Sequence, residues 1–207
     1  MGDFVELEWK RNWGWPWPED SWGLTPRFGE DGWCRSCGVP QRAQSGSLVL
    51  RKKGKTGPPA AWVPNWQFDV VCLERSLAEE IGAKFDIELC EVAWHGSGGA
   101  DAMQIVAPWT EQPWFDHDEL RAAAEQRHGV AGKTCPDCGA WRWMPLGFGV
   151  GLPPLRLDHA GQGKDVIASP EWFGDGWNAF RQLLFRRELA ELIVAACPRE
   201  VKINDVL

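Results

Sequence analysis

Two CxxCG motifs lie far apart in the chain, Cys34-Arg-Ser-Cys-Gly38 and Cys135-Pro-Asp-Cys-Gly139. Together the two CxxC turns supply four thiolates, the number of ligands that a tetrahedral structural zinc ion takes. The glycine after each second cysteine lets the turn tighten, so that backbone amides can approach the sulfur atoms. We therefore predict one structural Zn2+ per chain, bound by Cys34, Cys37, Cys135 and Cys138.

The separation of the two motifs, about a hundred residues, is much longer than in a compact zinc ribbon. The intervening chain must therefore fold so as to bring the motifs together. A redox dithiol is the competing interpretation of a CxxC pair, but it requires a thioredoxin-like βα context. Four thiolate ligands leave zinc no open position for water, so we expect the metal to contribute folding free energy and no chemistry.

An internal similarity accompanies the motifs. Residues 68–81 align with residues 180–193, and Phe, Arg, Leu, Ala, Glu and Ile recur at matching positions. Further upstream, Leu48 and Leu50 resemble Leu155 and Leu157. One CxxCG motif precedes each copy. The chain therefore reads as two copies of one unit, a zinc knuckle followed by a strand, a helix and a closing strand.

These patterns predict an α+β fold in which the two similar units join around one structural zinc. We expect a single domain over residues 1–207, with pseudo-repeat units at about 30–95 and 131–207. A strand and a helix in residues 96–130 link the units. The helix is predicted from Asp116 to Gly129, because Asp116 can cap its start and Gly129 can end it. Loose alternation predicts a further strand at residues 4–9.

Composition limits the functional classes. Hydrophobic residues make up 44% of the chain and charged residues 25%, which is the balance of a globular protein. The net charge is −7, whereas a nucleic-acid-binding protein usually presents a basic surface. Nucleic acid is therefore an unlikely partner.

The cysteines and the first residues indicate the compartment. Four of the seven cysteines stand in CxxC pairs, which favours metal binding in a reducing environment over disulfides. The first ten residues show no basic stretch leading into an apolar run, and no apolar stretch approaches the ~18 residues of a membrane span. We expect a cytoplasmic protein without a membrane span. The remaining cysteines, Cys72, Cys90 and Cys197, are expected in or near the core.

One pattern in the sequence is similar to that of an enzyme. His117-Asp-Glu119, followed by the second CxxC pair, is similar to the HxE and PCxxC motifs of zinc-dependent nucleobase deaminases. Here the proline follows the first cysteine instead of preceding it, and Cys34 and Cys37 would have no role. We find no Ser/His/Asp arrangement and no carboxylate pair to support catalysis, so we expect a protein that is not an enzyme.

The two CxxCG motifs and the closing strand-helix-strand at residues 165–206 resemble the double-CXXCG motif family of bacterial proteins. Members of that family are regarded as immunity proteins of polymorphic toxin systems. The resemblance implies a protein that binds a cognate toxin domain directly and neutralises it. The alternatives are a zinc-ribbon nucleic-acid or transcription-associated factor, disfavoured by charge, and a zinc-dependent enzyme, disfavoured by the filled ligand set.

A tryptophan-rich segment is the candidate partner-binding surface. Trp13, Trp15, Trp17 and Trp22 stand among prolines and glycines beside two acidic residues, in a stretch that cannot form a helix or a central strand. Tryptophan is enriched at interface hot spots. The alternative is a lid over the core, since tryptophan is highly buried on average.

Overall fold

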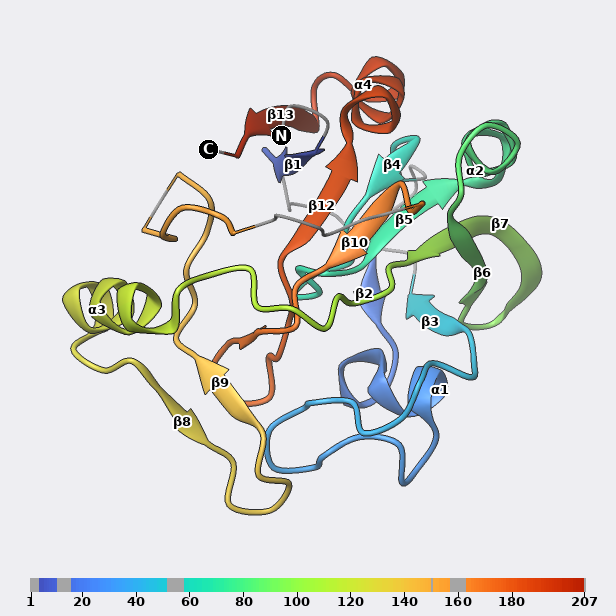
Figure 1. The fold of residues 1–207 in the computed structure, drawn as a ribbon. Helices are drawn as coiled ribbons and strands as arrows, with labels where there is room; N and C mark the ends of the chain where they lie inside the picture. The colour runs from blue at the N-terminus through green and yellow to red at the C-terminus, as the bar shows by residue number, and fades with distance from the viewer. Residues whose placement is uncertain (1–3, 11–15, 52–57, 150, 157–162, 207) are drawn as a thin grey trace.

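The computed structural model describes residues 4–10, 16–51, 58–149, 151–156 and 163–206 (Figure 1). Within these residues the chain is α+β, as predicted, with three β-sheets and four α-helices. None of these helices has the length and apolar character needed to cross a bilayer. Trp13 and Trp15 lie outside the described residues.

The largest sheet has six strands in the order β2-β3-β6-β7-β5-β4. Its strands are β2 (Trp17–Pro18), β3 (Leu48–Arg51), β4 (Ala61–Trp62), β5 (Val71–Glu74), β6 (Glu88–Trp94) and β7 (Ser97–Val106). Neighbours are antiparallel except β3 and β6, which pair in parallel. Helix α2 (Arg75–Gly82) leads from β5 to β6 and buries Leu77, Ala78 and Ile81. These residues fall on one face because positions three and four apart are neighbours on a helix.

A second sheet has four strands in the order β10-β12-β1-β13. Its strands are β1 (Phe4–Trp9), β10 (Val166–Ala168), β12 (Leu183–Arg186) and β13 (Val201–Asp205). The predicted strand at residues 4–9 is confirmed as β1, which buries Val5 and Leu7 and lies between β12 and β13. Helix α4 (Arg187–Ala196) leads from β12 to β13.

The two sheets share one local arrangement. Strands β5 and β6 flank β7, and strands β12 and β13 flank β1; in each case the flanking pair is connected by a helix and runs antiparallel to the middle strand. Strand β4 lies outside β5, and β10 lies outside β12. The helices α2 and α4 contact each other near the top of Figure 1. Side chains of both sheets and both helices form a single core.

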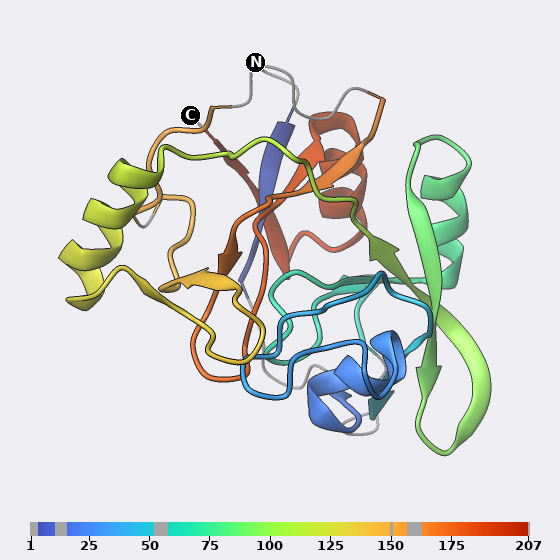
Figure 2. The same ribbon diagram turned by 60° about the horizontal axis from the view of Figure 1, so that its bottom comes forward.

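One helix and a three-stranded sheet form a separate layer on the other side of the four-stranded sheet (Figure 2). Helix α3 (His117–His128) has Asp116 as its N-cap and Gly129 in a left-handed conformation at its end, so the predicted helix is confirmed. A three-stranded sheet in the order β11-β9-β8 contains β8 (Gly132–Thr134), β9 (Trp141–Trp143) and β11 (Trp172–Phe173). A second core beneath α3 is rich in aromatic side chains, including Trp114, Phe115 and Phe173.

Two local expectations need correction. Leu155, expected to match Leu48 in a strand, lies in no strand and is buried in the second core; Leu157 is outside the described residues. The five-residue helix α1 (Leu24–Phe28), preceded by a 3-10 turn (Ser21–Gly23), was not expected. A helix this short spans little more than one turn, so its sequence cannot show a repeating apolar pattern.

Candidate metal centre

The four cysteines of the CxxCG motifs come together at one point. Knuckle 1, residues 34–38, lies in the long loop between α1 and β3, and knuckle 2, residues 135–139, is the turn between β8 and β9. The Sγ atoms of Cys34 and Cys135 are 3.7 Å apart, and those of Cys37 and Cys138 are 3.5 Å apart. All four sulfur atoms lie within 4.8 Å of one another.

This spacing fits a tetrahedral metal ion. A zinc–thiolate bond of ~2.3 Å places the sulfur atoms of a regular tetrahedron about 3.8 Å apart. The two sulfur–sulfur separations of 3.7 and 3.5 Å lie close to that value. The four cysteines are also the one group of histidine, cysteine and acidic side chains in the described ranges with metal-binding geometry. The predicted ligand set is therefore assembled, and four thiolates favour zinc.

The two knuckles share two backbone hydrogen bonds. In knuckle 1, the amide of Cys34 donates to the carbonyl of Val39 (2.9 Å) and the amide of Gly38 donates to that of Cys34 (2.8 Å). In knuckle 2, the amides of Cys135 and Gly139 make the equivalent bonds at 2.9 Å each. Both glycines have positive φ, 76° and 74°, a conformation in which a side chain is strained. The turn itself therefore favours glycine at both positions.

A side-chain contact also links the knuckles. The hydroxyl of Ser36 donates a hydrogen bond to the carboxylate of Asp137. Each of these residues lies between the two cysteines of its own motif, so the contact holds the turns face to face.

Burial and local amides act in opposite directions on the thiols. Cys34, Cys37 and Cys135 are buried, and Cys138 is half-buried. Burial raises the pKa of the Cys37 and Cys138 thiols, because the thiolate loses its hydration. The backbone amides of Cys138 and Asp137 lower the pKa of Cys135 to about 7. A divalent cation would offset the cost of the buried thiolates, as expected of a metal site.

A buried arginine lies directly behind the cysteines. Arg142, on β9, is 2% exposed and donates hydrogen bonds to the carbonyls of Cys37 (3.1 Å) and Gly176 (2.7 Å). A zinc ion held by four thiolates would carry a net negative charge, and the guanidinium at this place would balance part of it. Sequence reasoning missed this residue. The one sign of its importance in the sequence is that this positively charged residue stands between two tryptophans, three positions after Gly139.

The other cysteines lie outside the cluster. Cys72 and Cys197 are buried, as predicted, and burial raises the pKa of both thiols, that of Cys197 to about 11. Cys90 is half-buried, with its thiol 3.8 Å from the carbonyl of Gly46.

The residues of the deaminase-like pattern do not join the cysteines. His117 begins α3, where its ring lies 5.5 Å from that of Trp143 and its Nε2 lies 3.6 Å from the buried carboxylate of Glu171. Glu119 donates its amide to the cap residue Asp116. Both residues therefore lie at the start of a helix. The sulfur atoms near Cys135 and Cys138 are instead those of Cys34 and Cys37 in knuckle 1.

Among the predicted partner-binding tryptophans, the described ones lie near one edge of the large sheet. Trp17, on β2, is 38% exposed, and Trp22 is half-buried with its ring 6.5 Å from that of Trp66 in an edge-on contact. Neither is among the hydrophobic residues that pack around the four cysteines, which are Val39, Ala140, Trp172 and Ala179.

Comparisons with protein-family models, with curated proteins and with solved structures find no match. The fold and the site therefore define the class on their own. The chain is an α+β protein with a tetra-cysteine centre that could hold one metal ion.

Proposed function

We propose that this chain is a zinc-stabilised binding protein of the immunity type, which neutralises a bacterial toxin by direct contact. The observation that carries the proposal is the closed four-sulfur site, buried and backed by Arg142. Such a site holds a fold together and leaves zinc no position for substrate. The resemblance of the two CxxCG motifs to the double-CXXCG motif family adds the toxin as the partner.

The metal is tested first. Elemental analysis of the purified chain should find one zinc per chain, and Cys135→Ser should lower that content. Cys90→Ser is the matched control, because it removes a half-buried thiol outside the cluster. Absence of metal from wild-type protein, or equal loss in both variants, would refute the assignment.

We also propose that the two halves are copies of one ancestral unit related by an approximate twofold axis. In such an arrangement, residues near the axis contact their own counterparts. Three observations support it. Cys34 contacts Cys135 and Cys37 contacts Cys138; Phe68 packs on Phe180 with ring centroids 5.2 Å apart; and α2 contacts α4. Superposing β5, β6 and β7 on β12, β13 and β1 should bring α2 onto α4; helices that fall in unrelated positions would contradict the duplication.

A groove between the two large sheets is the surface that we assign to the toxin. It encloses about 950 Å³ and is lined by residues of both halves. Three of its aromatic side chains are unusually exposed: Trp66 (51%), Phe68 (49%) and Trp177 (49%). Trp22 extends this row through its contact with Trp66. Exposed aromatic groups in a depression are typical of interface hot spots.

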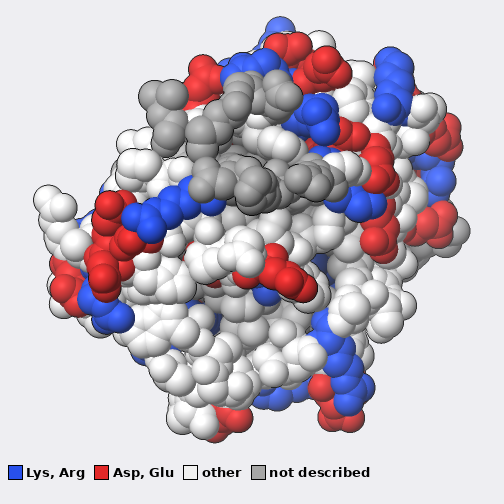
Figure 3. Space-filling view, viewed as in Figure 1, with Lys and Arg blue, Asp and Glu red and all other residues white. Residues whose placement is uncertain are grey.

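The charge distribution favours a protein over a nucleic acid as the partner. The exposed cations beside the knuckles are paired with carboxylates, Arg35 with Glu30 and Lys133 with Asp175. On the face shown in Figure 3, charged side chains of both signs lie mainly around the rim, and uncharged ones cover much of the middle. A nucleic-acid site needs a continuous basic surface to neutralise phosphates.

The toxin proposal is tested by expressing the chain together with the product of the adjacent toxin-like gene. The pair should copurify, and the chain should restore growth of cells that express the toxin. Trp66→Ala should weaken binding about 30-fold, the loss expected for a hot spot of ~2 kcal/mol. Val130→Ala is the control, because Val130 is similarly exposed (47%) and does not line the groove.

Two outcomes would count against the proposal. One is failure to copurify with any neighbouring gene product while the chain binds duplex DNA or RNA at physiological salt. The other is a Trp66→Ala variant that binds as tightly as wild type.

A further inference from the structure

A second cavity, distinct from the metal centre, lies where the two halves meet. It has a volume of about 380 Å³, within the range of small-molecule sites. One wall comes from the segment after knuckle 1 and from β7, and the opposite wall comes from the segment around β11 and β12. Ligand sites are common at such junctions between structural units.

The lining of this cavity has the opposite charge to the protein. It contains the guanidinium groups of Arg27, Arg42 and Arg181 and one carboxylate, that of Asp69. The chain as a whole carries a net charge of −7. An excess of cations gathered in one cavity of an acidic protein indicates a negatively charged ligand.

Arg27 is held in place by neutral groups. Its Nε donates to the side-chain oxygen of Gln44 (3.0 Å), and a terminal nitrogen donates to that of Gln67 (3.4 Å). The amide of Gln44 is in turn 3.1 Å from that of the buried Gln104. These amides orient the guanidinium, and the carboxylate of Asp69 offsets part of its charge. Arg42 and Arg181 leave the cavity with an excess of cations. Burial lowers the pKa of Arg27, which shows that its charge lies in a poorly hydrated place.

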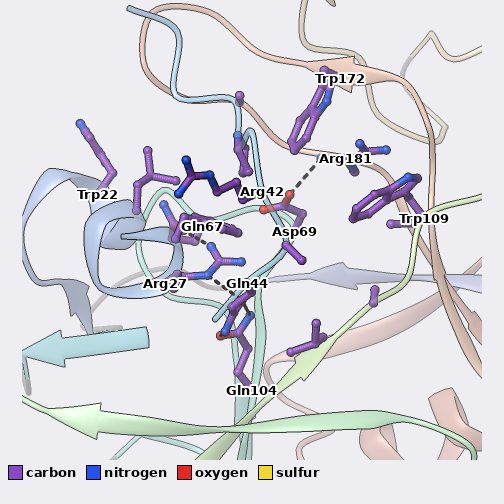
Figure 4. Close-up of a pocket in the computed structure, with 18 of the residues that line it drawn as sticks. Trp22, Arg27, Arg42, Gln44, Gln67, Asp69, Gln104, Trp109, Trp172 and Arg181 are labelled. Carbon is purple, nitrogen blue, oxygen red and sulfur yellow. Dashed lines mark hydrogen bonds between the residues drawn. The ribbon is translucent and has the colours of Figure 1, made fainter. Parts of the chain in front are cut away.

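Arg181 and two tryptophans form the opposite side (Figure 4). The guanidinium carbon of Arg181 lies 4.1 Å from the ring centroid of Trp172 and 5.0 Å from that of Trp109, so it stands between the two indoles. It also donates a hydrogen bond of 2.5 Å to the carbonyl of Ser169. The backbone amide of Arg181 donates to Asp69 (3.1 Å). Trp109 is thereby fixed while remaining 58% exposed, which makes it a preformed platform for a planar ring.

We propose that this cavity binds a small organic anion that contains a planar ring. The anionic group is held by Arg27 and Arg42, and the ring lies against Trp109. Arginine suits this role because its planar set of donors matches carboxylate and phosphate oxygens. Mononucleotides and aromatic carboxylates share this chemistry. The proposal does not rest on the toxin, because Trp109 and Arg42 line the cavity and not the groove.

The test is calorimetric titration of the full-length, metal-loaded chain with four probes: adenosine monophosphate, indole-3-acetate, benzoate and inorganic phosphate. At least one ring-bearing anion should bind with a Kd at or below about 1 mM. Inorganic phosphate should bind at least tenfold more weakly, because it lacks the ring. If adenosine monophosphate binds best, the cavity prefers a phosphate; if indole-3-acetate or benzoate binds best, it prefers a carboxylate.

Variants locate the binding. Arg27→Gln and Arg42→Gln should each weaken the best probe about tenfold, the loss expected for one charge-assisted contact. Trp109→Ala should weaken it similarly, and Trp109→Phe should restore part of the affinity. Arg75→Gln is the control, since Arg75 is an arginine of α2 that lies outside the cavity lining. Arg42 is exposed, so its variant remains informative if Arg27→Gln does not fold.

Three results would overturn the proposal. They are no binding of any probe up to about 10 mM, equal affinity for phosphate and for the ring-bearing anions, and unchanged affinity in both Arg42→Gln and Trp109→Ala.

Discussion

Gly38 and Gly139 hold equivalent places in the two knuckles and have nearly the same φ, 76° and 74°. Their surroundings differ. A Cβ atom on Gly38 would lie 2.2 Å from the carbonyl oxygen of Trp177, whereas a Cβ atom on Gly139 would meet nothing within 4 Å. The first knuckle is therefore pressed against the neighbouring backbone, and the second faces open space.

This difference predicts unequal costs for the same substitution. Gly139→Ala should cost only the strain of a left-handed residue, about 1–2 kcal/mol. Gly38→Ala should cost about 1–3 kcal/mol more, because the backbone at Trp177 must also move. Urea unfolding of the two zinc-loaded variants measures both values. Equal losses of unfolding free energy in the two variants would show that the backbone at Trp177 moves aside without a measurable cost.

Arg142 supports a prediction about metal affinity. Arg142→Leu replaces the guanidinium with a shorter apolar side chain and so removes the charge and both hydrogen bonds; zinc affinity should therefore fall about 10–100-fold. Lys133→Leu is the control, because Lys133 lies opposite Arg142 in the β8–β9 hairpin but has an exposed side chain. Competition with a chromophoric chelator gives both constants. If the variants bind zinc equally, the guanidinium has no part in the site.

Single residues differed in how well they could be predicted. The cysteines were predictable because four ligands in two short motifs specify a metal geometry locally. Arg142, Arg27 and Asp69 were not, because their importance depends on contacts with segments distant in the sequence. A charged residue in a sequence usually indicates solvent exposure, and only the tertiary structure shows the exception.

Helix α3 is stabilised at its start by Asp116. The carboxylate accepts hydrogen bonds from the amides of Glu119 (3.1 Å) and Asp118 (2.9 Å) and pairs with Arg156 (2.6 Å). The two amides are the main reason that the pKa of Asp116 lies below its usual value. The folded-state pKa is thus lower than the unfolded one. The stabilisation is complete above the unfolded pKa, about 3.9, and is lost as the pH falls through the folded value.

Substitutions of Asp116 should separate the stability contributed by its charge from the stability contributed by its capping hydrogen bonds. Asp116→Ala should lower Tm by a few degrees at neutral pH. Asp116→Asn should lose less, because asparagine also caps helices. The difference in stability between wild type and Asp116→Asn should shrink as the pH falls below about 4. Loss of metal in acid affects both proteins, so it cancels in this difference. A constant difference down to about pH 2 would contradict the assigned pKa shift.

At the level of elements, local signals were sufficient for β1, which alternates loosely, and for α3, which has a cap residue at its start and a glycine at its end. Pairing was not predictable. The parallel pairing of β3 with β6 and the position of β1 between β12 and β13 depend on contacts between distant segments. A strand's alternation shows which face is buried but does not identify its neighbours.

For the molecule as a whole, the metal centre links segments 101 residues apart. Cys135→Ser, or removal of zinc by a chelator, should lower Tm by about 10 °C or more, since the free energy of metal binding is also free energy of folding. Cys90→Ser should melt close to wild type. A Cys135→Ser variant with wild-type Tm would mean that the centre is peripheral to stability.

The central element of the four-stranded sheet has a consequence for biosynthesis. Among the described strands β1 leaves the ribosome first, yet both of its neighbours, β12 and β13, are made last. The nascent chain can assemble the hairpin of β6 and β7 early, because those strands are adjacent in sequence. It cannot finish the second sheet until translation has passed Asp205. During that interval both edges of β1 are open to pairing with other chains, and such exposed edges attract chaperones and promote aggregation.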